Sequence, residues 1–120
     1  MAEDRNYIRK RRVPRRAFHR QIGVLARGNY YITYAYEIGE GGMLFASKQK
    51  LSVNQKVVLS FNVPGFVHVV CRAVIRYSKK LEGVHDPVYG VQFETIEFNS
   101  KRKVRSYVAQ KSAEEIEAAA

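Results

Sequence analysis

The chain has a single cysteine, no tryptophan, three histidines and no long hydrophobic run. Cys71 alone forms no internal disulfide, and the scattered histidines lack the ligand spacing of a zinc site. No stretch approaches the roughly 18 apolar residues that a membrane-spanning helix needs. Residues 1–5 include three charged side chains, and no apolar stretch like that of a secretory signal follows them. We therefore expect a cytoplasmic protein without membrane insertion, structural metal or disulfide.

Groups that carry out catalysis are also scarce. Acyl or phosphoryl transfer needs a nucleophile with a base, paired carboxylates or converging metal ligands, and the sequence suggests none of these. His85 and Asp86 are neighbours in a turn-rich segment, which is more typical of a solvated loop than of a catalytic pair. Cys71 lies in an apolar strand, where an inert core thiol is expected. We predict that the chain is not an enzyme and carries no cofactor.

Acidic residues are few as well: 11 Asp and Glu oppose 21 Lys and Arg, for a net charge of +10. Eight of the basic residues fall within the first twenty positions, where only Glu3 and Asp4 oppose them. Such a basic segment favours an anionic partner: a nucleotide, nucleic acid, acidic lipid or acidic protein surface. Arginine also binds phosphate bidentately and matches the O6 and N7 edge of guanine.

Between residues 17 and 93 the dominant pattern is a period of two, which is typical of strands with one buried face. Ile22, Val24 and Ala26 form one such run. Tyr30, Ile32, Tyr34, Tyr36 and Ile38 share one side of the next run, and Val57, Leu59, Phe61 and Val63 form another. With the runs at 43–46, 66–77 and 88–93, six strands at short spacing predict a mainly β protein, a small antiparallel barrel.

After the strands, Asn99 or Ser100 is suited to cap a helix that begins near Lys101. Val104, Tyr107 and Val108 fall on one face of this helix, which we expect to pack on the open end of the barrel. We predict one domain: a flexible basic arm at residues 1–16, the barrel with its C-terminal helix at 17–112, and a helix extension or frayed tail at 113–120.

Two motifs give the chain a family resemblance. An RxxxR arm precedes the first strand, best matched by Arg11 and Arg15, with Arg12 and Arg16 as the alternative register. The second motif, [DN]xSxxG, falls on the turn from Glu37 to Gly42, and residues 89–93 look like a closing strand. Together these features resemble the PilZ domain over nearly the whole length of the chain.

The resemblance implies a six-stranded bacterial barrel that binds cyclic di-GMP and moves its N-terminal arm on doing so. By the same resemblance, Arg11 and Arg15 clamp phosphates and guanine edges, Arg16 adds charge, and the turn holds a guanine. The turn departs from the pattern at Glu37, where Asp or Asn is usual, and at Gly39, where Ser is usual, while Gly42 is intact. Each lost hydrogen bond costs on the order of 1 kcal/mol, which predicts an affinity roughly tenfold to a hundredfold weaker.

Three functions are therefore compared. The leading one is a monomeric cyclic di-GMP receptor that signals to a protein effector in motility, pili or surface attachment. The second is a degenerate PilZ-like module that binds protein without the nucleotide, as the changes at Glu37 and Gly39 suggest. The third is nucleic-acid binding with Tyr30, Tyr31, Tyr34 and Tyr36 as stacking platforms. It is disfavoured, because tyrosines in an alternating strand usually pack across strands.

Overall fold

The computed structural model describes residues 15–65 and 67–119, with side chains described as far as Gln110. Residues 1–14 of the predicted arm, including Arg11 and Arg12, lie outside the described residues. Seven elements follow in order: β1 (Arg15–Ala26), β2 (Asn29–Gly39), β3 (Gly42–Ala46), β4 (Lys56–Val63), β5 (Val67–Lys79), β6 (Val88–Thr95) and α2 (Phe98–Ala119). The sequence-based prediction of six strands followed by one C-terminal helix is confirmed.

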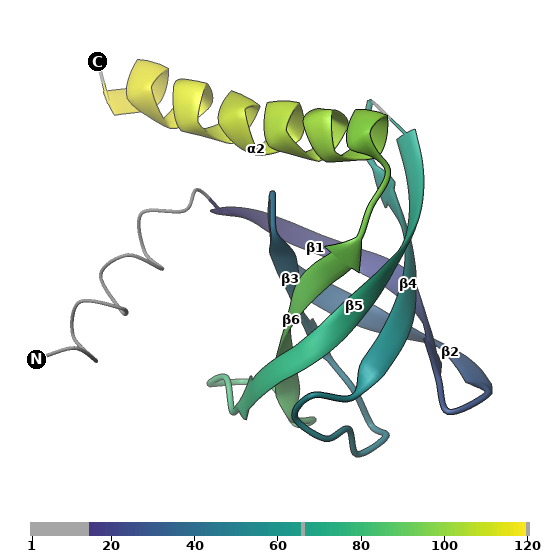
Figure 1. The fold of residues 1–120 in the computed structure, drawn as a ribbon. Helices are drawn as coiled ribbons and strands as arrows, with labels where there is room; N and C mark the ends of the chain where they lie inside the picture. Colours follow the sequence, from purple (N-terminus) through teal and green to yellow (C-terminus); the bar gives the residue numbers. More distant parts are fainter. Residues whose placement is uncertain (1–14, 66, 120) are drawn as a thin grey trace, which may run out of the picture.

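The six strands close into a barrel in the order β1-β2-β3-β6-β5-β4, and every neighbouring pair is antiparallel (Figure 1). Closure is made by β1 and β4, where residues 23–25 pair with residues 58–60. Because the sheet is closed, it has no edge strand with unpaired backbone groups along its whole length.

The predicted alternation holds for most of the barrel wall. Ile22, Val24 and Ala26 of β1 are buried, as are Val57, Leu59, Phe61 and Val63 of β4. These side chains point inward and form one core with the inward-facing residues of β5 and β6. Such a core supplies most of the favourable free energy of folding, since burial of an aliphatic side chain stabilises by roughly 1.5–3 kcal/mol.

Strand β2 departs from the predicted pattern. Tyr30, Ile32 and Tyr34 face outward and are exposed, whereas Ile38 is fully buried. The pairing of β2 shifts register between Ala35 and Glu37, and this bulge moves the following residues to the opposite phase. The prediction that Tyr30 to Ile38 share one side of the strand is therefore wrong at Ile38, while the Tyr36 ring stays beside that of Tyr34, with centroids 5.1 Å apart.

Helix α2 covers one end of the barrel, close to the start of β1 (Figure 1). Val104, Tyr107 and Val108 are buried in the barrel core, as predicted. The Tyr107 ring meets Phe18 of β1 edge to face, with ring centroids 6.1 Å apart. The helix is thus part of the hydrophobic core of the domain.

The helix begins at Phe98, three residues before the predicted start. The Glu97 carbonyl accepts a hydrogen bond from the Lys101 amide, and the Ser100 hydroxyl donates to the Glu97 carboxylate at 3.3 Å. Glu97 therefore closes the first turn, in place of the predicted cap at Asn99 or Ser100. Among the described residues, no helix combines the length and the apolar character needed to cross a membrane.

Candidate functional site

The two sequence motifs meet where β1 begins and β2 ends. Arg15 pairs with Gly39 in the β1–β2 register, and Ala17 pairs with Glu37. Arg15 Nη1 lies 3.7 Å from Glu37 Oε1, and each side chain is about two-fifths exposed. An exposed ion pair of this length contributes only about 0–1 kcal/mol to stability. Both charged groups therefore remain accessible to a ligand at low energetic cost.

The neighbouring Arg16 has different partners. Its Nη1 donates a hydrogen bond to the Tyr107 carbonyl at 2.9 Å, and its guanidinium lies 3.8 Å from the centroid of the Tyr107 ring. A cation over an aromatic face and a charge-assisted hydrogen bond each stabilise this arrangement. Arg16 thus connects the start of β1 to helix α2.

The turn between β2 and β3 is also attached to the helix. Arg105 Nη2 donates to Glu40 Oε1 at 2.6 Å, and this hydrogen bond is the main reason that the pKa of Glu40 is lowered. On the other side, the Phe93 amide donates to the Gly41 carbonyl at 2.8 Å. The second motif is therefore held between α2 and β6.

Gly42 has a packing role of its own. A Cβ atom at this position would lie 2.1 Å from the carbonyl oxygen of Val91 on β6, a distance that no real side chain adopts. Gly42 pairs with Gln92, so β3 and β6 approach closely at the end of the turn. A glycine in this position allows a close approach of two backbones.

Register brings further side chains beside the turn. Glu37, Leu44, Gly90 and Tyr77 are successive partners across β2, β3, β6 and β5. Leu44 is buried in a second apolar cluster on this face. The Tyr77 ring lies over Gly90, where a Cβ atom would meet it at 2.2 Å.

Arg76 and Gln92 lie on the same side of the barrel and were missed by the sequence analysis. Arg76 Nε donates to Gln92 Oε1 at 2.8 Å, and Gln92 is the register partner of Gly42. Arg76 falls within the predicted strand at 66–77, but that prediction gave no information about which strand would lie beside it. Only the pairing of β3 with β6 brings this guanidinium near the motif turn.

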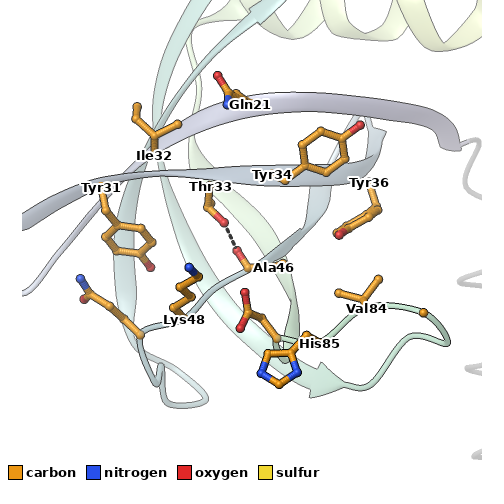
Figure 2. A pocket seen from close by; sticks show the side chains of 13 residues that line it. Gln21, Tyr31, Ile32, Thr33, Tyr34, Tyr36, Ala46, Lys48, Val84 and His85 are labelled. Carbon is orange, nitrogen blue, oxygen red and sulfur yellow. Dashed lines mark hydrogen bonds between the residues drawn. The ribbon is translucent and has the colours of Figure 1, made fainter.

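A separate cavity of about 590 Å³ lies between β2, the segment after β3 and the loop from β5 to β6 (Figure 2). Thr33 donates a hydrogen bond to the Ala46 carbonyl there, and the hydroxyls of Tyr31 and Ser47 are hydrogen-bonded at 2.8 Å. Burial raises the pKa of Tyr31. No residue of the turn from Glu37 to Gly42 lines this cavity, so it is distinct from the site at Arg15.

His85 and Asp86 both line this cavity. His85 is exposed, as the sequence analysis expected of a solvated loop. In the ranges 15–65 and 67–119, no cluster of three or more His, Cys, Asp or Glu side chains is arranged to hold a metal ion. Cys71 is buried inside the barrel, and burial raises its pKa to about 12.

The family comparison matches the chain over most of its length. A family model described as PilZ domain matches residues 9–110. No curated protein sequence matches the chain.

Several solved structures have the same fold. The Bacillus subtilis inhibitor of motility, MotI/DgrA, superposes with a TM-score of 0.77 at 13% identity, covering 86% of this chain and 51% of that one. The PilZ domain with c-di-GMP of YcgR from Escherichia coli superposes with a TM-score of 0.65 at 16% identity, covering 92% of this chain and 97% of that one. Borreliella burgdorferi PlzA in complex with c-di-GMP superposes with a TM-score of 0.62 at 12% identity, covering 89% of this chain and 45% of that one. The chain thus spans about half the length of MotI and PlzA.

Proposed function

The chain belongs to the PilZ domain family, and from this premise we propose that it is a receptor for cyclic di-GMP. The observation that carries the proposal is the meeting of Arg15 with Glu37, one residue from each motif, at 3.7 Å on an accessible surface. PilZ domains are receptor and adaptor domains, and the proposed role is accordingly a receptor rather than an enzyme.

In this proposal, Arg15 and Arg11 bind the phosphates and the O6 and N7 edge of a guanine, as the planar fork of arginine allows. The Glu37 carboxylate accepts hydrogen bonds from the N–H groups of the guanine base. Gly39 lets the nucleotide approach the backbone closely, whereas the side-chain space at Gly42 is filled by the Val91 carbonyl of β6. The Arg15–Glu37 pair opens at little cost, since exposed ion pairs are weak.

The Arg11 and Arg15 register is favoured over Arg12 and Arg16. Arg16 is already engaged by the ring and carbonyl of Tyr107, so its use as a phosphate ligand would break both contacts. Among the residues that the structure describes, the contact that Arg15 would lose is its loose pair with Glu37. Arg16 then contributes to the site through its charge and through its position at the helix.

The proposed biological role is ligand-controlled signalling. A cyclic di-GMP molecule that orders the arm changes the surface offered to a protein effector in motility, pili or surface attachment. An inhibitor of motility and two complexes with c-di-GMP among the structural relatives support this choice. We propose that the protein acts in the bacterial cytoplasm as a monomer, without cofactor, membrane insertion or nucleic-acid partner.

A second function is kept because Glu37 and Gly39 depart from the motif. In this case the exposed Arg15–Glu37 pair joins β1 to β2 without binding a ligand. In this alternative the domain binds its protein partner without the nucleotide.

The test is a calorimetric titration with cyclic di-GMP at near-physiological salt, on the wild type and on Arg11→Ala, Arg15→Ala and Arg72→Ala. Arg72 is the matched control, since it lies on the outer face of β5 opposite Val58 and its removal changes the net charge equally. A charge-assisted hydrogen bond is worth about 1.5–3 kcal/mol, so Arg11→Ala and Arg15→Ala should each weaken binding at least about tenfold. Absence of saturable binding by the wild type would establish the nucleotide-independent alternative.

A further inference from the structure

Exposed apolar side chains gather on one outer face of the barrel. Seven large hydrophobic residues are exposed in the part of the chain that the structure describes, and five of them lie on β1, β2 and β5: Leu25, Tyr30, Ile32, Tyr34 and Val70. Val70 is 63% exposed, Tyr30 62% and Ile32 56%. Single exposed apolar residues are ordinary, whereas a contiguous group marks an interaction surface.

Strand register shows that these residues are contiguous. Ile32, Gly23, Ser60 and Val70 are successive partners across β2, β1, β4 and β5. Tyr30, Leu25, Val58 and Arg72 form the adjacent row on the same strands. Directly opposed side chains in antiparallel pairs lie about 5 Å apart. We call the surface formed by Leu25, Tyr30, Ile32, Tyr34, Val58 and Val70 the hairpin face.

Gly23 makes this surface continuous. A Cβ atom at Gly23 would meet the hydroxyl oxygen of Tyr30 at 2.2 Å and its ring carbons at 2.8–2.9 Å. The Tyr30 ring therefore lies across the glycine and links the two rows. The ring covers the backbone at Gly23, where a larger residue would displace it. The two rows thus form one apolar platform.

The polar edge of the hairpin face is ordered. His68 joins Ser60 and Asn62 across the β4–β5 pair, with Nε2 3.0 Å from Ser60 Oγ and Nδ1 2.6 Å from Asn62 Oδ1. Beneath this face, residues 23–25 of β1 pair with residues 58–60 of β4, and these pair with residues 70–72 of β5. The platform is thus ordered before a partner binds, so binding costs little conformational entropy.

The charge at the border decides the chemistry of the partner. Arg72 belongs to the second row, Arg27 stands in the turn that follows Leu25, and Lys56 lies two residues before Val58. The Glu94 carboxylate reaches this border but is paired with Lys56 at 3.3 Å. A second copy of the chain would bring the same cations against these, whereas an acidic surface complements them.

From these observations we propose that the hairpin face docks a protein partner whose contact surface has apolar side chains at its centre and carboxylates at its border. This inference deepens the proposed receptor function, since it assigns the surface for the effector. Glu37 lies five positions after Ile32 on β2, about 16 Å away at the rise of a strand. The nucleotide and the partner therefore bind to different parts of the same two strands and can be present together.

The first experiment locates the partner. A photo-crosslinking residue, p-benzoylphenylalanine, replaces Ile32 in the full chain in its native host. In the control variant the same residue replaces Val53. Val53 is 59% exposed but lies in the loop before β4, away from the hairpin face. A protein adduct at position 32, absent at position 53 and identified by mass spectrometry as an acidic protein, is expected. An adduct with a second copy, a nucleic acid or a lipid, or equal labelling at both positions, would overturn the proposal.

The second experiment measures binding of that identified protein after purification. Ile32→Ser, Val70→Ser and Arg72→Glu are each expected to weaken binding about tenfold or more, as central apolar and charged contacts do. Val53→Ser is expected to change binding less than about twofold. Unchanged binding in the three variants would reject the hairpin face as the docking surface.

Titration with cyclic di-GMP on the same variants separates this proposal from the receptor function. The three substitutions are expected to leave nucleotide binding at the wild-type level, because none contacts Arg15 or Glu37. Partner binding without nucleotide binding in the wild type would reject the receptor function and leave the docking surface standing. If the wild type binds the nucleotide but the three substitutions leave partner binding unchanged, the docking surface is rejected and the receptor function stands.

Discussion

At Gly42 the space for a side chain is taken by the backbone of the neighbouring strand. The carbonyl oxygen of Val91 would lie 2.1 Å from a Cβ atom, and β6 cannot retreat without losing its pairing with β3. Gly41, one residue earlier, has open space around its Cα. The glycine of the motif is therefore required by the barrel itself, whether or not a ligand uses it.

We predict that Gly42→Ala lowers the free energy of unfolding by roughly 1–3 kcal/mol, as overpacking of a closely packed site does. Gly41→Ala, the matched control, is expected to stay within about 0.5 kcal/mol of the wild type. Urea denaturation followed by circular dichroism gives both values. Equal stability of the two variants would contradict the role of Gly42 in strand packing.

Among the elements, helix α2 is attached to the site side of the barrel by apolar and polar contacts together. Val104 and Tyr107 enter the core, Arg16 holds the Tyr107 carbonyl and ring, and Arg105 holds Glu40 of the motif turn. The polar contacts join the helix to the segments that carry both sequence motifs. The position of the helix is thus coupled to the region in which the nucleotide is proposed to bind.

We expect Arg16→Ala to lower the free energy of unfolding by about 1–2 kcal/mol, because it removes a charge-assisted hydrogen bond and a cation–π contact. The neighbouring Arg15→Ala removes the same charge but only an exposed ion pair, and should cost about 0.5 kcal/mol or less. Thermal and urea unfolding of the two variants measure the difference. If Arg15→Ala proved the more destabilising, the assignment of Arg16 to the helix would be wrong.

At the scale of the whole molecule, closure of the barrel isolates its interior from water. Cys71 lies on the inner side of β5, and its burial raises the pKa of its thiol from 9.0 to about 12. Below pH 9 the thiol is neutral in the folded and unfolded chain, so it adds no pH dependence. Between about pH 9 and 12 the unfolded chain releases this proton while the folded chain retains it. Stability therefore falls as pH rises in this window.

We predict that the wild type loses about 1.4 kcal/mol of stability per pH unit relative to Cys71→Ala between pH 9.5 and 11. The comparison cancels the lysines and tyrosines that titrate in the same range. Urea unfolding of both proteins at several pH values gives the difference. Parallel pH profiles would mean that the thiol has the same pKa in the folded and the unfolded chain.

Much of the fold could be predicted from local patterns. Alternation identified the six strands, and the apolar face of residues 104–108 identified the helix and its packing against the barrel. The bulge at Ala35–Glu37 could not be predicted, since it depends on the pairing of β2 with both β1 and β3, which shifts register there on each side. The earlier helix start was missed because Glu97 is not among the preferred capping residues.

The candidate site was predictable in part. Arg15, Arg16, Glu37, Gly39 and Gly42 lie together at one end of the barrel, although their roles toward cyclic di-GMP remain predictions. Arg11 and Arg12 lie outside the described residues. Arg76 and Gln92 were not predictable, because their position depends on the pairing of strands far apart in the chain.

The sequence by itself determined the features that depend on near neighbours: the strands, the helix, the concentration of charge before β1 and the spacing of the two motifs. The tertiary structure decided which of two adjacent arginines faces Glu37 and which is held by Tyr107. It also decided that Tyr30, Ile32 and Val70 meet on one outer surface. The physical reason is register, because the pairing of each strand is set by packing against partners that lie far away in sequence.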